Sequence, residues 1–139
     1  MSMAVSAPLQ RALFEQLSAA PELAEIFGRI HDDAPHRSRE QGATPYVTLG
    51  DEVVQPWDTS TDRGAAHEAV IRVHAPQRGF LRVKELAAKI VELIEANPPT
   101  PSRGVVVTHQ FIGARTRREE NGASRRVDLT FRFVVEDDG

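Results

Sequence analysis

The sequence has no cysteine and no long apolar run, and these absences exclude several classes of protein. Without cysteine, the 139-residue chain has neither a disulfide framework nor thiolate chemistry, which fits synthesis in a reducing cytoplasm. No segment approaches the roughly 20 apolar residues of a membrane-spanning helix. Residues 1–8 also lack the charged and apolar regions of a signal peptide. We therefore expect a soluble intracellular protein without membrane contact.

Lysine is scarce, and positive charge is unevenly placed. The formal net charge is -3, whereas dedicated nucleic-acid-binding domains usually carry a strong positive excess. Only Lys84 and Lys89 among the 17 basic residues are lysines. Arginines crowd the last third of the chain: Arg103, Arg115, Arg117, Arg118, Arg125, Arg126 and Arg132. This pattern indicates a solvated hairpin, or a surface that contacts acidic subunits or DNA phosphates.

The length and the 40% hydrophobic content predict one domain over residues 1–139 with a single small core. A core of this size gives a small free energy of unfolding, so association with other copies would stabilise the fold. Residues 136–139 are polar and acidic, and we expect a disordered tail there.

Apolar spacing predicts two main helices. Residues 7–19 place Leu9, Leu13 and Leu17 on one face, and Pro21 then begins a short helical segment that ends at Gly28. Residues 80–96 carry a broader apolar stripe, made of Val83, Leu86, Ala87, Ile90, Leu93 and Ile94. The sequence Asn97-Pro98-Pro99 stops this helix.

Four segments are predicted to be strands: residues 46–49, 69–74, 105–120 and 127–135. The first extends to Val54 across a bulge at Gly50. Polar loops occupy residues 29–44 and 55–65. Asn121-Gly122 joins the last two strands as a tight hairpin turn.

The resulting order α-β-β-α-β-β predicts an α+β fold. We expect a four-stranded, mainly antiparallel sheet with the two main helices packed on one face. The other face would then carry partly bare apolar side chains at Val70, Val106, Ile112 and Val134, and such patches commonly mark partner surfaces.

Few residues point to chemistry. The five histidines show no metal-binding spacing, so we expect no metal, no cofactor and no catalytic residue. If an enzyme of unrecognised type were present, His67 and Glu68 would be the pair to test. Trp57 stands in a loop beside Asp58, either as an anchor that folds the loop onto the core or as a contact between subunits.

The order of several short motifs resembles the tail-completion proteins of long-tailed phages and gene transfer agents, also called tail terminators or tail-to-head joining proteins. After the N-terminal helix come Tyr46-Val47-Thr48, Trp57-Asp58-Thr59, Gly64, His67-Glu68, Arg125 and Phe131-Arg132-Phe133. One departure is His74-Ala75, where relatives often show an aromatic residue followed by serine.

The resemblance implies a structural virion protein rather than an enzyme. Proteins of this kind form a ring, typically a hexamer, which caps the tail tube, ends its polymerisation and joins it to a head-completion (stopper) protein. DNA would pass through the lumen without being read. The protein would move from the cytoplasm of the producing cell to the head-tail junction of the particle. In such a ring, we expect contacts with subunits or partners from Trp57, Asp58, Arg115, Arg117, Arg118, Arg125 and Arg126.

Two alternatives from other classes remain open at this point. The Arg-rich hairpin at residues 115–126 would serve a small nucleic-acid-binding module, which salt-dependent DNA binding would reveal. A small enzyme would lose its activity on His67→Ala.

Overall fold

A twisted sheet of six strands carries the fold in the computed structural model, which describes residues 2–32, 44–56, 64–76, 80–119 and 124–138. The strands are β1 (Ile30–His31), β2 (Tyr46–Thr48), β3 (Glu52–Pro56), β4 (Gly64–Ala75), β5 (Val105–Glu119) and β6 (Ser124–Glu136). Their order is β1-β2-β4-β6-β5, and β3 also pairs with β4. All pairs are antiparallel except β1 with β2. The mainly antiparallel α+β class is therefore confirmed.

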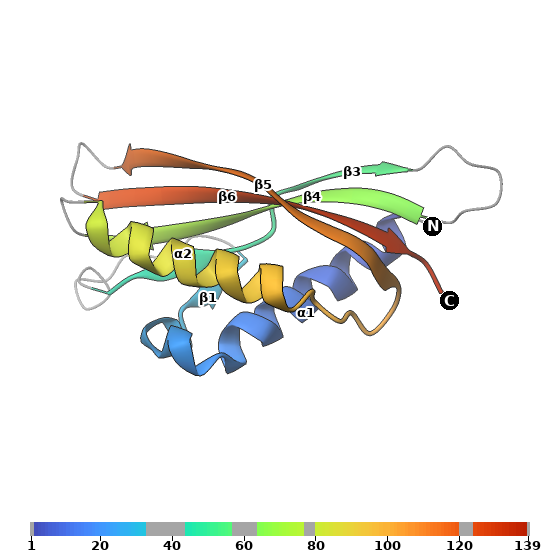
Figure 1. The fold of residues 1–139 in the computed structure, drawn as a ribbon, viewed down its shortest axis with the longest axis horizontal. Helices are drawn as coiled ribbons and strands as arrows, with labels where there is room; N and C mark the ends of the chain where they lie inside the picture. Colours follow the sequence, from blue (N-terminus) through green and yellow to red (C-terminus); the bar gives the residue numbers. More distant parts are fainter. Residues whose placement is uncertain (1, 33–43, 57–63, 77–79, 120–123, 139) are drawn as a thin grey trace.

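Both main helices lie on the same side of the sheet (Figure 1). After a 3-10 turn, η1 (Ser2–Val5), the helices are α1 (Ser6–Ala19), the 3-10 segment η2 (Pro21–Ile26) and α2 (Leu81–Ala96). These bounds confirm the predicted helices to within a residue. Helix α2 ends where the backbone of Asn97 becomes extended, although its N–H still donates to the Leu93 carbonyl at 3.0 Å. Two prolines follow and prevent continuation.

The prediction of four strands was wrong, and two short strands account for the difference. β1 lies in a stretch that we expected to be a loop, where the Val47 N–H donates to the Arg29 carbonyl at 2.9 Å. β3 does not continue β2 across a bulge. Gly50, at φ 119°, separates the two strands, and each pairs with a different half of β4. Such pairing is decided by contacts distant in the sequence.

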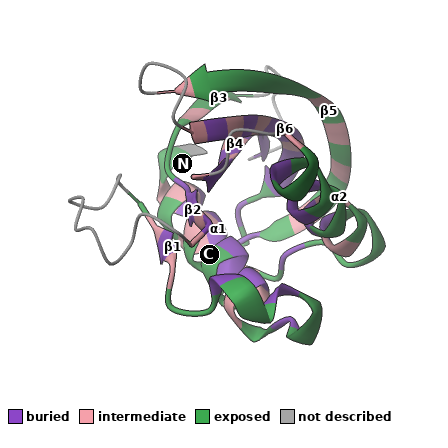
Figure 2. Cartoon of the chain, turned by 90° about the vertical axis from the view of Figure 1, so that its left-hand side faces the viewer, coloured by how far each residue is buried: buried purple, intermediate pink, exposed green. Residues whose placement is uncertain are grey.

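The core lies between the helices and one face of the sheet, the inner face (Figure 2). Alternate residues of β4 and β6 point into it, as the period of two predicts. Phe131 and Phe133 are among the largest fully buried side chains, and their ring centroids lie 6.0 Å apart. From the helices, the apolar residues predicted to form the two stripes join the same cluster, including Leu9, Leu17 and Ile90.

The outer face, opposite the helices, is less apolar than we predicted. Register shifts at Val107 and Ile112 turn β5, so Val106 packs partly against the core instead of facing outward. Val134 is only 3% exposed. Of the four residues expected there, Ile112 is 48% exposed and Val70 is partly buried. The expected bare patch therefore reduces mainly to the bulged edge strand.

The segment after residue 135 is held in place as far as residue 138, although we expected a disordered tail. Glu136 ends β6. Arg103 donates to both carboxylate oxygens of Asp137, at 2.8 and 2.9 Å, and the Gly104 N–H donates to Asp138 at 2.7 Å. These bonds tie the end of β6 to the start of β5.

Candidate interaction surface on the outer sheet face

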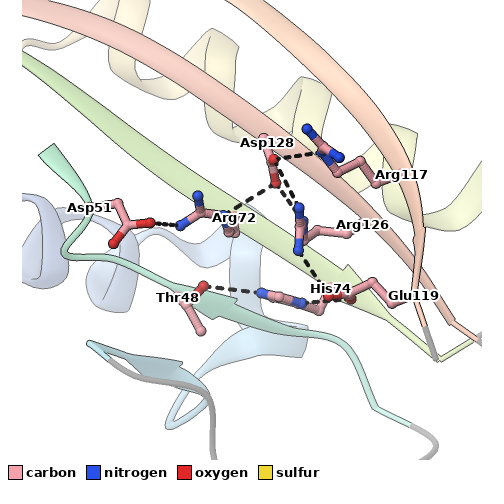
Figure 3. Close-up of polar contacts among 8 residues, drawn as sticks. All are labelled: Thr48, Asp51, Arg72, His74, Arg117, Glu119, Arg126 and Asp128. Atoms are coloured by element: carbon pink, nitrogen blue, oxygen red, sulfur yellow. Dashed lines mark hydrogen bonds and ion pairs between the residues drawn. The ribbon is translucent and has the colours of Figure 1, made fainter.

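One end of the outer face carries a connected set of polar side chains, which we call the charged network (Figure 3). Strand alternation brings its members together, since Arg72 is paired with Asp128 across β4 and β6, and Arg126 with Arg117 across β6 and β5. The members are Thr48, Asp51, Arg72, His74, Arg117, Glu119, Arg126 and Asp128.

Asp128 is the anionic centre of the network. Its carboxylate lies 2.7 Å from Arg126 Nε and 3.5 Å from the Nε atoms of both Arg72 and Arg117. Arg72 also reaches Asp51. Burial alone would lower the pKa of Arg126, but its bonds to Asp128 and Glu119 and their charges raise it. Three guanidinium groups are therefore gathered around one carboxylate on this face.

His74 links strands that do not pair with each other. Its Nδ1 lies 3.0 Å from Glu119 on β5, and its Nε2 lies 3.0 Å from the Thr48 hydroxyl on β2. The hydrogen bond with His74 is the largest influence on the carboxyl group of Glu119 and, with the charge of Arg126, holds its pKa below the ordinary value. The network thereby spans the sheet from β2 to β5.

The five arginines that we predicted for the interface fall into three groups. Arg117 and Arg126 belong to the charged network. Arg125 points inward, is only 8% exposed and lies 5.0 Å from the ring centroid of Phe80. Arg115 and Arg118 are exposed, and they make no ion pair within the described part of the chain. The other two predicted residues, Trp57 and Asp58, lie outside the described residues.

A second polar cluster lies on the inner face, and no pattern in the sequence predicts its geometry. His67 is fully buried, with Nδ1 3.3 Å from Glu52, and the Ser6 hydroxyl donates to the same carboxylate. Burial would raise the pKa of Glu52, but the hydrogen bonds from His67 and Ser6 outweigh it and lower the pKa. Glu68 points to the opposite face, so His67 and Glu68 do not form a joint site.

Across the described ranges, no three His, Cys, Asp or Glu side chains are placed to hold a metal ion. No described helix is long and apolar enough to cross a membrane. An open groove of about 600 Å³ lies between α1 and β1, with Arg11, Phe14, Ile30 and His31 among its lining residues.

Comparison with known proteins identifies the family. The family model described as tail completion protein gp17 matches residues 11–136. The chain belongs to this family. A chain from the virion of a native gene transfer agent particle is 36% identical, with a TM-score of 0.85 over 96% of this chain and 98% of that one. No curated protein sequence matches the chain.

A second solved structure extends the likeness to a bacteriophage. The gp17 protein of bacteriophage SPP1 is 16% identical, with a TM-score of 0.58 over 100% of this chain and 98% of that one, and this likeness concerns the fold alone. The tail-completion resemblance, including its gene-transfer-agent branch, is thus confirmed. Membership of this family also confirms that the protein is structural and not an enzyme.

Proposed function

We propose that this tail-completion protein forms a ring, expected to be a hexamer, on the end of a tail tube. The ring ends tube polymerisation and binds the head-completion (stopper) protein on its other side. The observation that carries this proposal is the match to the tail-completion family over residues 11–136, together with the 36% identity to a chain of a gene transfer agent virion.

The charge distribution supports a head-to-tail ring. Residues 115–132 contain six of the 17 basic residues but only three of the 20 acidic ones, so the rest of the chain is strongly acidic. A cyclic ring needs two unlike surfaces on each subunit, because each copy contacts its neighbours through different patches. A basic hairpin and an acidic remainder meet this requirement. We place Arg115, Arg117, Arg118 and Arg126 in such contacts, with Trp57 and Asp58, and omit the buried Arg125.

The nucleic-acid-binding alternative is weaker. Arg72, Arg117 and Arg126 are already paired with Asp128, so a phosphate, like an acidic subunit, would have to compete with that carboxylate. Among the described residues, this leaves Arg115 and Arg118 as the hairpin arginines that are exposed without an ion pair. The net charge of -3 also favours passage of DNA through a lumen over tight binding. Strong, salt-dependent DNA binding by the purified protein would reverse this preference.

Deletion of the gene in the producing strain tests the proposed role. Electron microscopy should show tails of uncontrolled length that are not joined to heads, and a plasmid copy of the gene should restore normal particles. Tails of normal length attached to heads in the deletion strain would contradict the proposal. Antibody labelling should place the protein at the head-tail junction, after its synthesis in the cytoplasm.

A further inference from the structure

We infer that the ring closes by continuing the sheet from copy to copy, with β5 of one copy paired with β3 of the next. This inference rests on the ring proposed above and names the surfaces that close it. It follows from the position, composition and direction of the two strands.

Both strands offer a free edge. Within the described part of the chain, β5 is the terminal strand of the sheet and pairs only with β6, while β3 pairs only with β4. A free edge presents unpaired backbone N–H and C=O groups, which can bond to another chain. The two edges lie on opposite sides of the central pair β4 and β6, as a head-to-tail contact requires.

The two edges also stand at the same level along the sheet. Val53 is paired with Glu68, Glu68 with Arg132, and Arg132 with Gln110. In the same way, Gln55 is paired with Ala66, Ala66 with Val134, and Val134 with Thr108. A neighbouring copy without stagger therefore brings its β3 beside residues 108–110 of β5.

The facing segments are largely apolar and carry little edge protection. Residues 105–114 contain no Asp, Glu, Lys, Arg or Pro, the residues that commonly block an edge. β3 has two residues of these types. The side chain of Glu52 is bonded to Ser6 and His67, and Pro56 is the last residue of the strand, after the stretch 53–55 that would pair. Among the described strands, the large exposed apolar side chains all lie on these two edges: Val53, Val105, Val107 and Ile112. Pairing the edges would cover them against one another.

Strand direction makes the new pair antiparallel. β3, β4, β6 and β5 alternate in direction, so β3 runs opposite to β5 within one copy. Rotation about an axis parallel to the strands preserves direction, so β5 and the β3 of the next copy are also antiparallel. This is the more stable arrangement per residue.

Charge complementarity favours a second copy as the occupant of the edge. His31 is connected through Thr48, Arg72 and Asp128 to Arg115, so β1 stands at the level of the arginines on β5. Asp32 is exposed directly after β1. Since β1 lies one strand further out than β3, the neighbouring β5 can pair with β3 only through residues before 115 and has to turn away at β1, which brings the exposed guanidinium of Arg115 near this carboxylate.

Cysteine cross-linking tests the pairing directly, because the native chain has no cysteine. Two proteins with one cysteine each, Val53→Cys and Gln110→Cys, are purified, mixed over a concentration series and oxidised mildly. Both positions are exposed, and within one copy three strand spacings, about 14 Å, separate them. That exceeds the Cα separation of about 7 Å that a disulfide allows. A second mixture, Val53→Cys with Thr108→Cys, detects the pairing if β3 and the neighbouring β5 are shifted by two residues.

We expect disulfide-linked dimers to form in the Val53→Cys and Gln110→Cys mixture. The dimer fraction should exceed the fraction in either protein alone. It should also exceed the fraction in a control mixture of Val53→Cys and Arg115→Cys. The double variant Val53→Cys/Gln110→Cys should give a ladder that stops at the ring size. Light scattering behind size exclusion reports assembly independently. Rings without specific cross-links would overturn the edge pairing and leave the ring intact. Monomers without cross-links at every concentration would also overturn it, and the deletion experiment then decides the proposed function separately.

Discussion

The imidazole ring of His74 lies flat against the phenol ring of Tyr46, with the ring centroids 4.3 Å apart and 5° between the planes. This is the strand end at which the sequence departs from the tail-completion resemblance, in which an aromatic residue is often found. The histidine keeps the stacking and adds bonds to Thr48 and Glu119. Stacking and hydrogen bonding at this site can therefore be separated by substitution.

His74→Phe should preserve the stacking but remove both hydrogen bonds. We expect a loss of about 1–2 kcal/mol in the free energy of unfolding, because Thr48 and Glu119 lose a buried partner. His74→Ala should cost more, since it also removes the ring contact. Urea unfolding curves measure both variants. Equal losses for Phe and Ala would show that the hydrogen bonds carry the whole effect.

Stability should fall on acidification through two carboxylates. The pKa values of Glu52 and Glu119 lie below the ordinary 4.5 in the folded protein. The unfolded chain therefore takes up these protons first as the pH falls, and the stabilisation present above about pH 4.5 is lost as the pH drops through the lowered values. The double variant Glu52→Gln/Glu119→Gln should be less stable at neutral pH, with a flatter pH dependence. Urea midpoints between neutral and acidic pH test this, and an unchanged slope would contradict it.

Gly104→Ala should be strongly destabilising. Gly104 has φ 91°, and an added Cβ would lie 2.9 Å from methyl groups of both Val5 and Val135. We expect a loss above about 2 kcal/mol, from backbone strain plus the clash. Gly28→Ala is the matched control, because φ is 75° there and no atom lies within 4 Å of the added Cβ. The midpoint of thermal unfolding should be lower for Gly104→Ala than for Gly28→Ala. Equal midpoints would show that the clash at Gly104 does not destabilise the protein.

The proposed interface predicts a defect in assembly without unfolding. Arg117→Glu/Arg118→Glu and, separately, Trp57→Ala should lower the yield of tailed particles. Lys84→Glu/Lys89→Glu makes the same change in charge on the exposed face of α2 and should assemble normally. Circular dichroism verifies the fold of each variant. Normal assembly of both interface variants would contradict the proposed placement of these residues in the interface.

The amphipathic segments could be read from the sequence because their signal is local. The two long helices and the inner face of β6 show their periods of 3.6 and two within one segment. β1 could not be found this way, since two residues show no period and its partner β2 lies beyond an intervening polar stretch. The outward position predicted for Val106 failed because a bulge reverses the alternation of β5.

The candidate surface was predictable in composition but not in geometry. The cluster of arginines was evident, but only the strand register shows that Arg125 turns inward while Arg126 binds Asp128. The pair formed by buried His67 and partly buried Glu52 could not be predicted, because β3 was not distinguished from β2 in the sequence.

β6 occupies the middle of the sheet, between β4 and β5, yet it is the last of the six strands to leave the ribosome. Its pairing with β4 joins residues as distant as Gly64 and Glu136. The central ladder therefore cannot form during translation of the earlier strands, and long-range closure of this kind slows folding. A growing chain lacks the strand that joins its two halves. β3 and β4 can pair before that, but β5 joins their sheet only once β6 has been made, so the two edges proposed to close the ring belong to one sheet only when the chain is nearly complete.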